Sequence, residues 1–534
     1  MLPTMPDFPL TITSIMRHGT ELHPEREVVT YTGEGFRRQP YRSLRRDVTR
    51  LAAALRGLGV TGDRRVATFM WNNGEHLAAY LAVPSMGAVL HTLNMRLFPE
   101  QLVYIANHAE DEVLLVDASL IPLLEPILPQ LRTVRQVIVV GEGEIDAQGR
   151  PVHDYHALLA AAPDDFDWPR VEENSAAAMC YTSGTTGNPK GVVYSHRSAY
   201  LHSMSICTAN GMGLSAADRV LPIVPMFHAN AWGLPYAAML GGASLVMPDR
   251  HLHAPHLARI IEEERPTLSG AVPTIWSDLL RHAREHGADM SSLRLVTCGG
   301  SAVPESLMRA LSDEFGVHLV QAWGMTETSP LATVAHPPVD AADPWEYRVT
   351  QGRLLAGVEA RIVGDGETVL PNDGVSVGEL EVRGPWVTAS YYRDEDGSRF
   401  HDGWLRTGDV GRLDEHGYVT LTDRAKDVIK SGGEWISSVE LENLLMGHPE
   451  VVEAAVIGVP DDRWGERPLA CVVVSGTAGA ADLRDHLAGK VARWQLPERW
   501  AFIPEVPKTS VGKFAKRVLR EMAADGRLEV IRLT

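Results

Sequence analysis

"YTSGTTGNPKG", residues 181–191, is the stretch of this sequence that decides its fold. It contains three glycines, four serine or threonine hydroxyls, a proline and Lys190. Apolar runs at 176–180 and 192–194 flank it, so the pattern predicts a loop between two strands. Glycines let backbone N–H groups approach a ligand, and hydroxyls with an ammonium satisfy phosphate oxygens. The stretch therefore predicts a phosphate-binding loop, with a flexible surface loop as the alternative.

This loop differs from the common nucleotide-binding loop. The pattern G-x-x-x-x-G-K-[ST] places its lysine directly after a glycine and a hydroxyl residue directly after the lysine. Here Pro189 precedes Lys190 and Gly191 follows it. Whether the loop binds phosphate therefore depends on what the rest of the chain contains.

The bulk composition narrows the class of protein. A chain of 534 residues exceeds what one hydrophobic core usually organises, so we expect at least two domains. Its formal charge is 50 − 68 = −18, which argues against nucleic-acid partners and anionic membranes. Its four cysteines are far apart and show no C-x-x-C spacing, which indicates reduced thiols and no cysteine metal site.

The sequence shows no targeting signal that we recognise. The N-terminus has no basic region followed by an apolar stretch, so we expect no secretory signal. No window approaches the length of a membrane span, and the C-terminal IRLT is not a peroxisomal address. These observations predict a cytoplasmic protein with no integral membrane segment.

The pattern of apolar residues predicts an α/β protein. A helical periodicity runs over 44–58, and short apolar runs begin at residues 65, 112, 136 and 293. Strands of this kind, separated by helices, predict parallel sheets covered on both faces. From about residue 350 the chain changes to short glycine-punctuated strands, which predict a small β-rich subdomain.

A sharper change occurs near residues 422–445, where Ser437 and Glu440 form a possible capping box at the start of a helix. Strand candidates and a further helix pattern follow it. We therefore predict an N-terminal domain over 1–425 and a small α+β domain over 426–534.

Another stretch, QAWGMTETSP at 321–330, holds groups that suit an adenine nucleotide. Trp323 offers a stacking plane, Thr326 a hydroxyl, and Glu327 a carboxylate able to hold Mg²⁺. The alternative is a strand that ends in a capped turn, with Glu327 as a solvated charge.

Two later stretches carry further candidates. In GWLRTGDVG, residues 403–411, Asp409 lies between glycine turns where a carboxylate can bind ribose hydroxyls, or it is an ordinary turn residue. In PKTSVGKFAKRVLRE, residues 507–521, Lys513 follows a glycine and is a candidate site residue. The alternative is that this basic run is the solvent-exposed face of a terminal helix.

The order of these stretches resembles the adenylate-forming superfamily of acyl-CoA synthetases, luciferases and peptide-synthetase adenylation domains. The resemblance covers nearly the whole chain. Within the superfamily, VPMFHANAWGLPY at 224–236 and IKSGGEWISSVELENLLMGHP at 429–449 are most similar to medium- and long-chain fatty acyl-CoA synthetases and methylmercaptopropionate-type ligases. The resemblance implies a mobile C-terminal domain, ATP, Mg²⁺ and coenzyme A as cofactors, and a possible homodimer.

The resemblance also implies roles for single residues around ATP. The phosphate loop would comprise Thr182, Ser183, Gly184, Thr185, Thr186, Gly187 and Lys190, with the metal near Ser183 and Glu327. The adenine slot would comprise Gly300, Ser301, Ala302, Ala322, Trp323 and Gly324. Thr326 would touch the α-phosphate, and Asp409 and Arg424 would bind ribose. Many relatives have tyrosine where this chain has Trp323, so any hydrogen bond of that phenol is in question.

The remaining roles concern the acid and the mobile domain. His228 would lie beside the substrate carboxylate, and Trp232 matches an aromatic gate of the acyl tunnel. The residues assigned to the mobile domain are Lys426 at the hinge, Lys430 and Trp435 at the nucleotide, Gly432 and Gly433 at the pantetheine arm, and the adenylation lysine Lys513.

The implied reaction explains why these residue types are needed. A carboxylate attacks the α-phosphorus of ATP, pyrophosphate leaves, and the acyl-adenylate then accepts the CoA thiol. Two anions must approach each other, so positive charge from Mg²⁺, Lys190 and Lys513 is required. The alternatives are a short-chain thioether acid as substrate, a separate carrier protein as acceptor, a luciferase-like oxygenase, and a catalytically silent nucleotide-binding protein.

Overall fold

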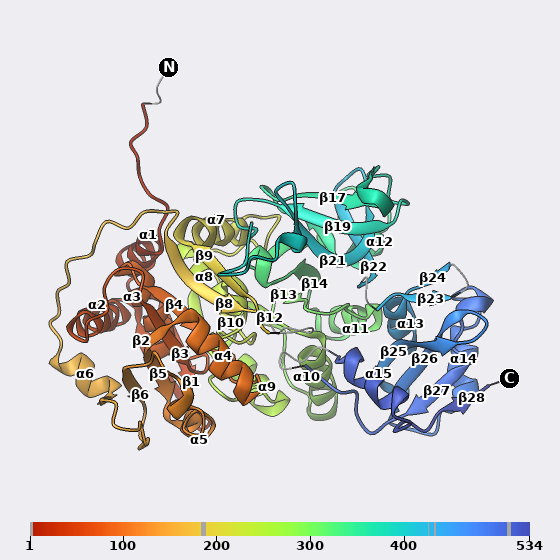
Figure 1. Ribbon diagram of the computed structural model, residues 1–534, viewed down its shortest axis with the longest axis horizontal. Coiled ribbons are helices and arrows are strands. Elements are labelled where there is room, and N and C mark those ends of the chain that lie inside the picture. Colours follow the sequence, from red (N-terminus) through yellow and green to blue (C-terminus); the bar gives the residue numbers. More distant parts are fainter. Residues whose placement is uncertain (1–3, 183–187, 425–426, 432–433, 510–513, 534) are drawn as a thin grey trace.

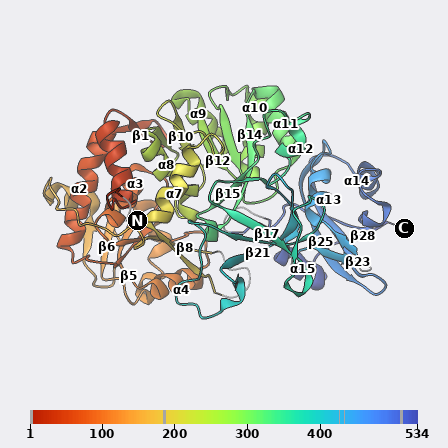
Figure 2. The same cartoon turned by 90° about the horizontal axis from the view of Figure 1, so that it is seen from above.

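The computed structural model describes residues 4–182, 188–424, 427–431, 434–509 and 514–533. Figure 1 shows the chain running from two adjoining sheets with helices, drawn in red to green, to a small lobe drawn in blue. In the view from above, the same lobe lies at the far end of the long axis (Figure 2). The predicted α/β fold with a large first part and a small second part is confirmed.

The first large sheet contains seven strands in the order β7-β6-β5-β3-β4-β8-β9. Neighbours along it pair in parallel, except that β8 and β9 are antiparallel. The strands are β3 (Arg65–Phe69), β4 (Val89–Thr92), β5 (Asp111–Asp117), β6 (Gln136–Val140), β7 (Val152–Asp154), β8 (Ala176–Tyr181) and β9 (Gly191–Ser195). The apolar runs that begin at 65, 112 and 136 thus form strands, as predicted.

The second large sheet has a parallel half. Its parallel strands are β1 (Glu27–Tyr31), β10 (Arg219–Pro222), β11 (Ser244–Met247), β12 (Leu268–Ala271), β13 (Leu295–Cys298) and β14 (Leu319–Gly324). Strand β2 (Phe36–Pro40) is antiparallel at the edge. The carboxyl ends of β12, β13 and β14 therefore meet at one edge of this sheet.

The predicted β-rich subdomain is antiparallel, but it does not form a sheet of its own. It comprises β15 (Leu331–Val334), β16 (Gly352–Leu354), β17 (Glu359–Val363), β18 (Val369–Leu370), β19 (Gly378–Arg383), β20 (Phe400–His401), β21 (Trp404–Leu413) and β22 (Tyr418–Arg424). Because β15 turns back onto β14, this half extends the second sheet and begins earlier than the glycine pattern indicated.

Helix α3 (Gly74–Ser85) shows how the two large sheets share one core. All twelve of its residues are buried, and it contacts strands of both sheets, which fits a helix that is mostly apolar all round, with Glu75 and His76 in its first turn. The Asn73 side chain caps it by accepting a hydrogen bond from the His76 amide at 2.9 Å. The core therefore continues from one sheet to the other and fixes their relative position.

The other helices of this part pack around the sheets. They are α1 (Ile12–Arg17), α2 (Tyr41–Gly57), α4 (Pro99–Ala109), α5 (Ile121–Leu124), α6 (Tyr155–Ala161), α7 (His196–Cys207), α8 (Leu234–Gly241), α9 (Ala254–Glu264), α10 (Pro273–His286), α11 (Glu305–Phe315) and α12 (Pro344–Arg348). Of these, α1 and α8 share the buried core with α3. Helix α2 buries Leu44, Val48, Leu51 and Leu55, as the periodicity over 44–58 predicts. Each such leucine stabilises the fold by roughly 1.5–3 kcal/mol.

The C-terminal part has a sheet and cores of its own. The strands are β23 (Ile429–Ser431), β24 (Glu434–Ile436), β25 (Val451–Asp461), β26 (Gly465–Val474), β27 (Arg499–Phe502) and β28 (Ile531–Arg532), and the helices are α13 (Ser438–Leu445), α14 (Ala480–Leu487) and α15 (Lys516–Ala524). Ser437 caps α13, since its hydroxyl accepts a hydrogen bond from the Glu440 amide at 3.1 Å. Two core clusters contain only residues beyond 428, so the C-terminal part is an α+β unit with cores of its own. The domain boundary at 425/426 stays a prediction.

A buried ionic cluster joins the last strand of the first part to this unit. We call Asp423, Ser438, Glu442 and Lys516 the hinge cluster. The Lys516 ammonium contacts Glu442 at 2.7 Å and Ser438 Oγ at 2.5 Å, and the Ser438 amide donates to Asp423 at 2.8 Å. Burial raises the pKa of Glu442 to about 7, although Lys516 acts to lower it.

Among the described residues, no helix is both long and apolar enough to cross a bilayer.

Candidate active site

The neck of the predicted phosphate loop is formed by antiparallel β8 and β9. The Thr182 amide donates to the Lys190 carbonyl at 2.9 Å, and the Lys190 amide donates to Thr182 Oγ1 at 3.1 Å. The prediction of a loop between two strands is thus confirmed. Five predicted phosphate ligands lie outside the described residues, namely Ser183, Gly184, Thr185, Thr186 and Gly187.

Lys190 leaves this neck toward a segment that the sequence did not single out. Its ammonium lies 2.8 Å from Asp394 and 3.5 Å from Asp396, and 4.9 Å from the centroid of the Tyr391 ring. The hydrogen bond to Asp394 raises the pKa of Lys190, so the side chain is a fixed positive charge. The only signal for this contact was the acidic run DED at 394–396, which carries no information about its partner.

Thr326 and Glu327 lie on a buried 3₁₀ turn, Thr326–Thr328, directly after β14. Neighbouring segments hold its backbone, because the Tyr194 hydroxyl donates to the Thr326 carbonyl at 2.7 Å and the Thr388 amide donates to the Glu327 carbonyl at 2.8 Å. The Tyr391 hydroxyl donates to Glu327 Oε1 at 2.6 Å. The turn therefore presents a carboxylate of fixed orientation.

The Glu327 carboxylate suits a hard divalent cation. It is only 5% exposed, and within the described part of the chain no lysine or arginine forms an ion pair with it. The same part of the chain contains no group of three ligating side chains. Mg²⁺ commonly takes one or two carboxylates and completes its shell with water and substrate phosphates, so a lone buried carboxylate fits it.

The residues of the predicted adenine slot lie at or just beyond the carboxyl ends of β13 and β14. A Cβ on Gly299 would lie 2.6 Å from the Ala322 carbonyl oxygen, so the loop that follows β13 touches β14 closely. Gly300 has a φ of 87°, a conformation that favours glycine. The start of this loop therefore lies against Ala322, and the slot of Gly300, Ser301, Ala302, Ala322, Trp323 and Gly324 stays a prediction.

Trp323 has a polar partner that the sequence did not reveal. Its indole Nε1–H donates to Asp409 Oδ2 at 2.8 Å, across 86 residues of sequence, and Arg424 Nε lies 3.3 Å from Asp409 Oδ1. Asp409 and Arg424 are also directly opposite each other on β21 and β22. The indole thus orients the carboxylate that is predicted to bind ribose.

We expect Trp323→Phe to raise the KM for ATP about tenfold, because the ring keeps its stacking plane but Asp409 loses a charge-assisted hydrogen bond. Preference for ATP over 2′-deoxy-ATP should fall in the same variant. Initial rates of pyrophosphate release with each nucleotide measure both effects. Trp500→Phe is the matched control, since its N–H bonds to the Pro497 carbonyl in the C-terminal unit. Unchanged nucleotide kinetics in Trp323→Phe would contradict the assignment.

A left-handed turn carries the predicted substrate residues. Ala229, Asn230, Ala231 and Trp232 have φ values of 42°, 51°, 48° and 57°, which cost roughly 1–2 kcal/mol each for residues other than glycine. Asn230 anchors the turn by accepting hydrogen bonds from the Tyr80 hydroxyl at 3.3 Å and from Cys180 Sγ at 3.2 Å. His228 immediately precedes the turn.

This turn aims the Trp232 ring at the adenine loop. Its six-membered ring would lie 3.4 Å from a Cβ on Gly270 and 3.7 Å from a Cβ on Gly299, so it covers the ends of β12 and β13. A predicted substrate residue and a predicted nucleotide loop therefore adjoin each other. The roles of His228 and Trp232 stay predictions.

The predicted residues of the C-terminal unit are not joined to these groups by any described contact. Lys430 and Trp435 are opposite each other on the β23–β24 hairpin, and Lys430 is exposed. Lys426, Gly432, Gly433 and Lys513 lie outside the described residues. Contacts between the described parts of the two domains include the hinge cluster, the Ser437 hydroxyl, which donates to the Thr422 carbonyl, and Ser306 Oγ, which donates to the Met446 carbonyl at 3.4 Å.

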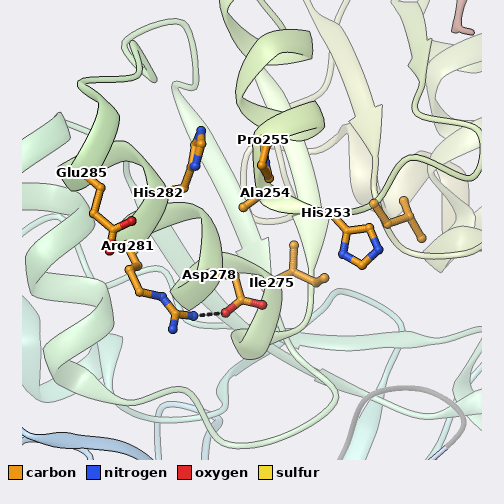
Figure 3. A pocket seen from close by; sticks show the side chains of 9 residues that line it. His253, Ala254, Pro255, Ile275, Asp278, Arg281, His282 and Glu285 are labelled. Atoms are coloured by element: carbon orange, nitrogen blue, oxygen red, sulfur yellow. Dashed lines mark hydrogen bonds and ion pairs between the residues drawn. The ribbon is translucent and has the colours of Figure 1, made fainter. Parts of the chain in front are cut away.

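One hollow of the surface lies elsewhere. A cleft of about 310 Å³ opens between the start of α9 and α10, and Figure 3 shows Arg281 paired with Asp278 at its wall. His253 and His282 also line it, but no predicted site residue does. The candidate site instead comprises Lys190 next to the end of β8, the buried Glu327 carboxylate on the turn that follows β14, and the Trp323–Asp409 pair, which joins β14 to the middle of β21. An ammonium, a buried carboxylate and an indole–carboxylate pair are the kinds of group that a nucleoside triphosphate with its metal ion requires, so this is the candidate nucleotide site.

Comparison with known proteins identifies the family. Residues 16–392 match the AMP-binding enzyme family, and residues 440–513 match the AMP-binding enzyme C-terminal domain. The chain belongs to this family of adenylate-forming enzymes, as the order of its motifs predicted. The second match runs as far as Lys513.

Relatives match over almost the whole chain. The chain is 45% identical to the 3-methylmercaptopropionyl-CoA ligase of Ruegeria pomeroyi, over 98% of this chain and 99% of that protein. It is 44% identical to the long-chain-fatty-acid–CoA ligase of Thermus thermophilus, over 97% and 96%. Its fold is similar to the crystal structure of an anthranilate CoA ligase in complex with anthranoyl-AMP, with a TM-score of 0.88, 27% identity and coverage of 98% and 99%.

Proposed function

We propose that this protein is an AMP-forming acid:CoA ligase that activates a medium- or long-chain fatty acid. The observation that carries the proposal is a site in which Lys190 and Glu327 both contact Tyr391 and in which Trp323, paired with Asp409, lies just before the Glu327 turn, in a chain that is 44–45% identical to acid–CoA ligases. The reaction has two steps, activation of the acid with ATP and transfer of the acyl group to CoA.

In the first step, this chain's residues position two anions against each other. The loop from Thr182 to Lys190 holds the outer phosphates, Asp409 holds the ribose, and the Trp323 ring stacks on adenine. Mg²⁺, held by Glu327 and Ser183, would supply charge neutralisation when bound. Thr326 and His228 then lie at the α-phosphate and the substrate carboxylate, and Lys513 stabilises the charge that develops as pyrophosphate leaves.

In the second step, the C-terminal domain over 426–534 presents a different face to the acyl-adenylate. Lys426 is the pivot, Lys430 and Trp435 contact the nucleotide, and the Gly432–Gly433 loop borders the thiol path. The glycines suit a narrow path because they carry no side chain. A homodimer and a cytoplasmic location are parts of the same proposal.

A second candidate substrate is a short-chain thioether acid. The 45% identity to a 3-methylmercaptopropionyl-CoA ligase favours it about as strongly as the 44% identity to a long-chain ligase favours a fatty acid. An acyl tunnel distinguishes chain lengths by only about 1 kcal/mol per methylene, so the choice rests on the shape of the whole tunnel.

Pyrophosphate release from a panel of acids tests the proposal. The panel runs from propionate to stearate, with 3-methylmercaptopropionate and an aryl acid, each with and without CoA. We expect turnover that needs both acid and CoA and that peaks at one chain length. Release of only about one pyrophosphate per enzyme, indifferent to CoA, would indicate a trapped adenylate that awaits a carrier protein.

We expect Trp232→Ala to change acyl-chain selection more than the KM for ATP. Its ring covers the ends of β12 and β13, so its removal opens apolar volume beside the adenylate and should shift the preferred acid toward longer or bulkier chains. The ratio of kcat/KM values across the acid panel measures the shift. An effect confined to ATP would remove the gate hypothesis.

A further inference from the structure

A segment that no motif marked crosses both charged parts of the site. It runs from Trp386 to Asp396, between β19 and β20. Its backbone is tied to the glutamate turn, because the Thr388 amide donates to the Glu327 carbonyl at 2.8 Å. It is also tied to the phosphate loop, because the Tyr392 amide donates to the Gly191 carbonyl at 2.8 Å.

Tyr391 stands at the middle of this segment and is 6% exposed. Its hydroxyl donates to Glu327 Oε1 at 2.6 Å, and the Lys190 ammonium lies 4.9 Å from its ring centroid. The Phe400 ring packs edge-on against it with centroids 5.5 Å apart, which fixes the plane of the phenol. One rigid side chain therefore contacts both a carboxylate and an ammonium of the candidate site.

We propose that Tyr391 is a positioning residue for the triphosphate and its metal ion. Its hydroxyl sets the direction of the Glu327 carboxylate, and its ring face holds the Lys190 ammonium by a cation–π contact. The inference rests on the proposed function, since it matters only if Glu327 and Lys190 serve a nucleotide.

Lys190 and Glu327 carry opposite charges beside the buried Tyr391 side chain. Opposite charges attract strongly where water is scarce, so an unrestrained lysine and glutamate would tend to pair and neutralise each other. The Tyr391 phenol contacts both groups separately: its hydroxyl donates a hydrogen bond to Glu327, and its ring face contacts the Lys190 ammonium. Asp394 and Asp396 hold Lys190 from the other side, so the ammonium is oriented from two directions. Glu327 thus stays without a described counter-ion, and a triphosphate would take over Lys190 from the two aspartates.

The proposal predicts a specific change in metal dependence. Tyr391→Phe keeps the ring over Lys190 but removes the donor to Glu327, so we expect about a tenfold rise in the Mg²⁺ concentration that half-saturates nucleotide binding. Binding in EDTA should match that of the wild type, because the metal is then absent from both proteins. Tyr391→Leu removes the ring as well and should also weaken binding in EDTA.

Equilibrium binding of α,β-methylene-ATP, titrated with MgCl₂, is the primary measurement, and it needs no turnover. Tyr392→Phe is the matched control, since the adjacent ring packs on His108 with centroids 5.5 Å apart. In a Glu327→Gln background, Tyr391→Phe should cause no further loss of Mg²⁺ dependence, because the group it positions is gone. Thioester formation from supplied acyl-adenylate should be unchanged in Tyr391→Phe, since no pyrophosphate takes part.

Several results would overturn the assignment. The first two are a wild-type Mg²⁺ dependence of binding in Tyr391→Phe and an equal change of that dependence in Tyr392→Phe. The third is an effect of Tyr391→Phe that adds in full to the effect of Glu327→Gln. The fourth is failure of Tyr391→Phe to fold, which would indicate a structural role. If the wild type binds the analogue with Mg²⁺ but releases no pyrophosphate with any acid, the proposed function fails while the binding data still decide the role of Tyr391.

Discussion

Lys513→Ala is expected to lose at least about 100-fold in acyl-adenylate formation, while thioester formation from supplied acyl-adenylate survives. The reason is that the lysine supplies positive charge only while pyrophosphate departs from the α-phosphorus. A lysine suits this task because a compact charge on a flexible stem can enter the site and leave it as the domain moves. Acid-dependent pyrophosphate–ATP exchange measures the first step, and CoA consumption with synthetic acyl-adenylate measures the second.

The control for this variant is Lys490→Ala, an exposed lysine of the same unit. It should behave as the wild type in both assays. Equal losses of the two half-reactions in Lys513→Ala would show that the lysine acts on something common to both steps, such as the fold of the C-terminal domain, and that its assigned role is wrong.

Lys516→Met is expected to destabilise the C-terminal unit by about 3–5 kcal/mol at alkaline pH, because it leaves Glu442 buried without its counter-ion. The Glu442 side chain is 12% exposed and Lys516 is its ion-pair partner at 2.7 Å. Hydrogen exchange of the amides in β25 and β26 measures the loss in free energy of unfolding.

The pH dependence of this loss has a definite sign. The pKa of Glu442 is already raised to about 7, and removal of an ammonium that lowers it raises it further. Protonation of the carboxyl removes the uncompensated charge, so the destabilisation should be largest above pH 7 and should shrink as the pH falls through the raised pKa.

The double variant Lys516→Met/Glu442→Leu should recover most of the lost stability, since an apolar pair can replace a buried ion pair. Lys490→Met is the surface control and should lie within about 0.5 kcal/mol of the wild type. A stability of Lys516→Met that equals the wild type at high pH would mean that water reaches the hinge cluster.

The sequence predicted the parts of the site that are local. The two strands on either side of the loop and the cap at Ser437 follow from spacing over a few residues, and the structure has them in place. The same reasoning predicted the α/β class, because runs of apolar residues report burial directly. The adenine slot at 300–302 and 322–324 was implied by the resemblance and stays a prediction.

Contacts between distant segments could not be predicted in this way. The Trp323–Asp409 hydrogen bond joins β14 to β21 across 86 residues of sequence, and the two strands are separated in the sheet by β15, β16 and β22, so no local pattern indicates it. Tyr391 meets Glu327 and Lys190 through the path of the segment after β19, which no periodicity encodes. The left-handed turn was also missed, since alanines at 229 and 231 carry none of the usual glycine signal.

That turn restricts how the acyl specificity of this enzyme can be redesigned. Ala229 and Ala231 are buried and hold a backbone that β-branched side chains adopt with difficulty, so substitutions at these two positions would disturb the loop path before they reshaped a cavity. Glycine at either position would remove the backbone strain of the positive φ angle. It would also make the turn that orients the Trp232 indole more flexible. Libraries that seek new acid preferences should therefore vary the side chain at position 232 and the facing strand ends, and should leave the small residues on both sides of Asn230 as they are.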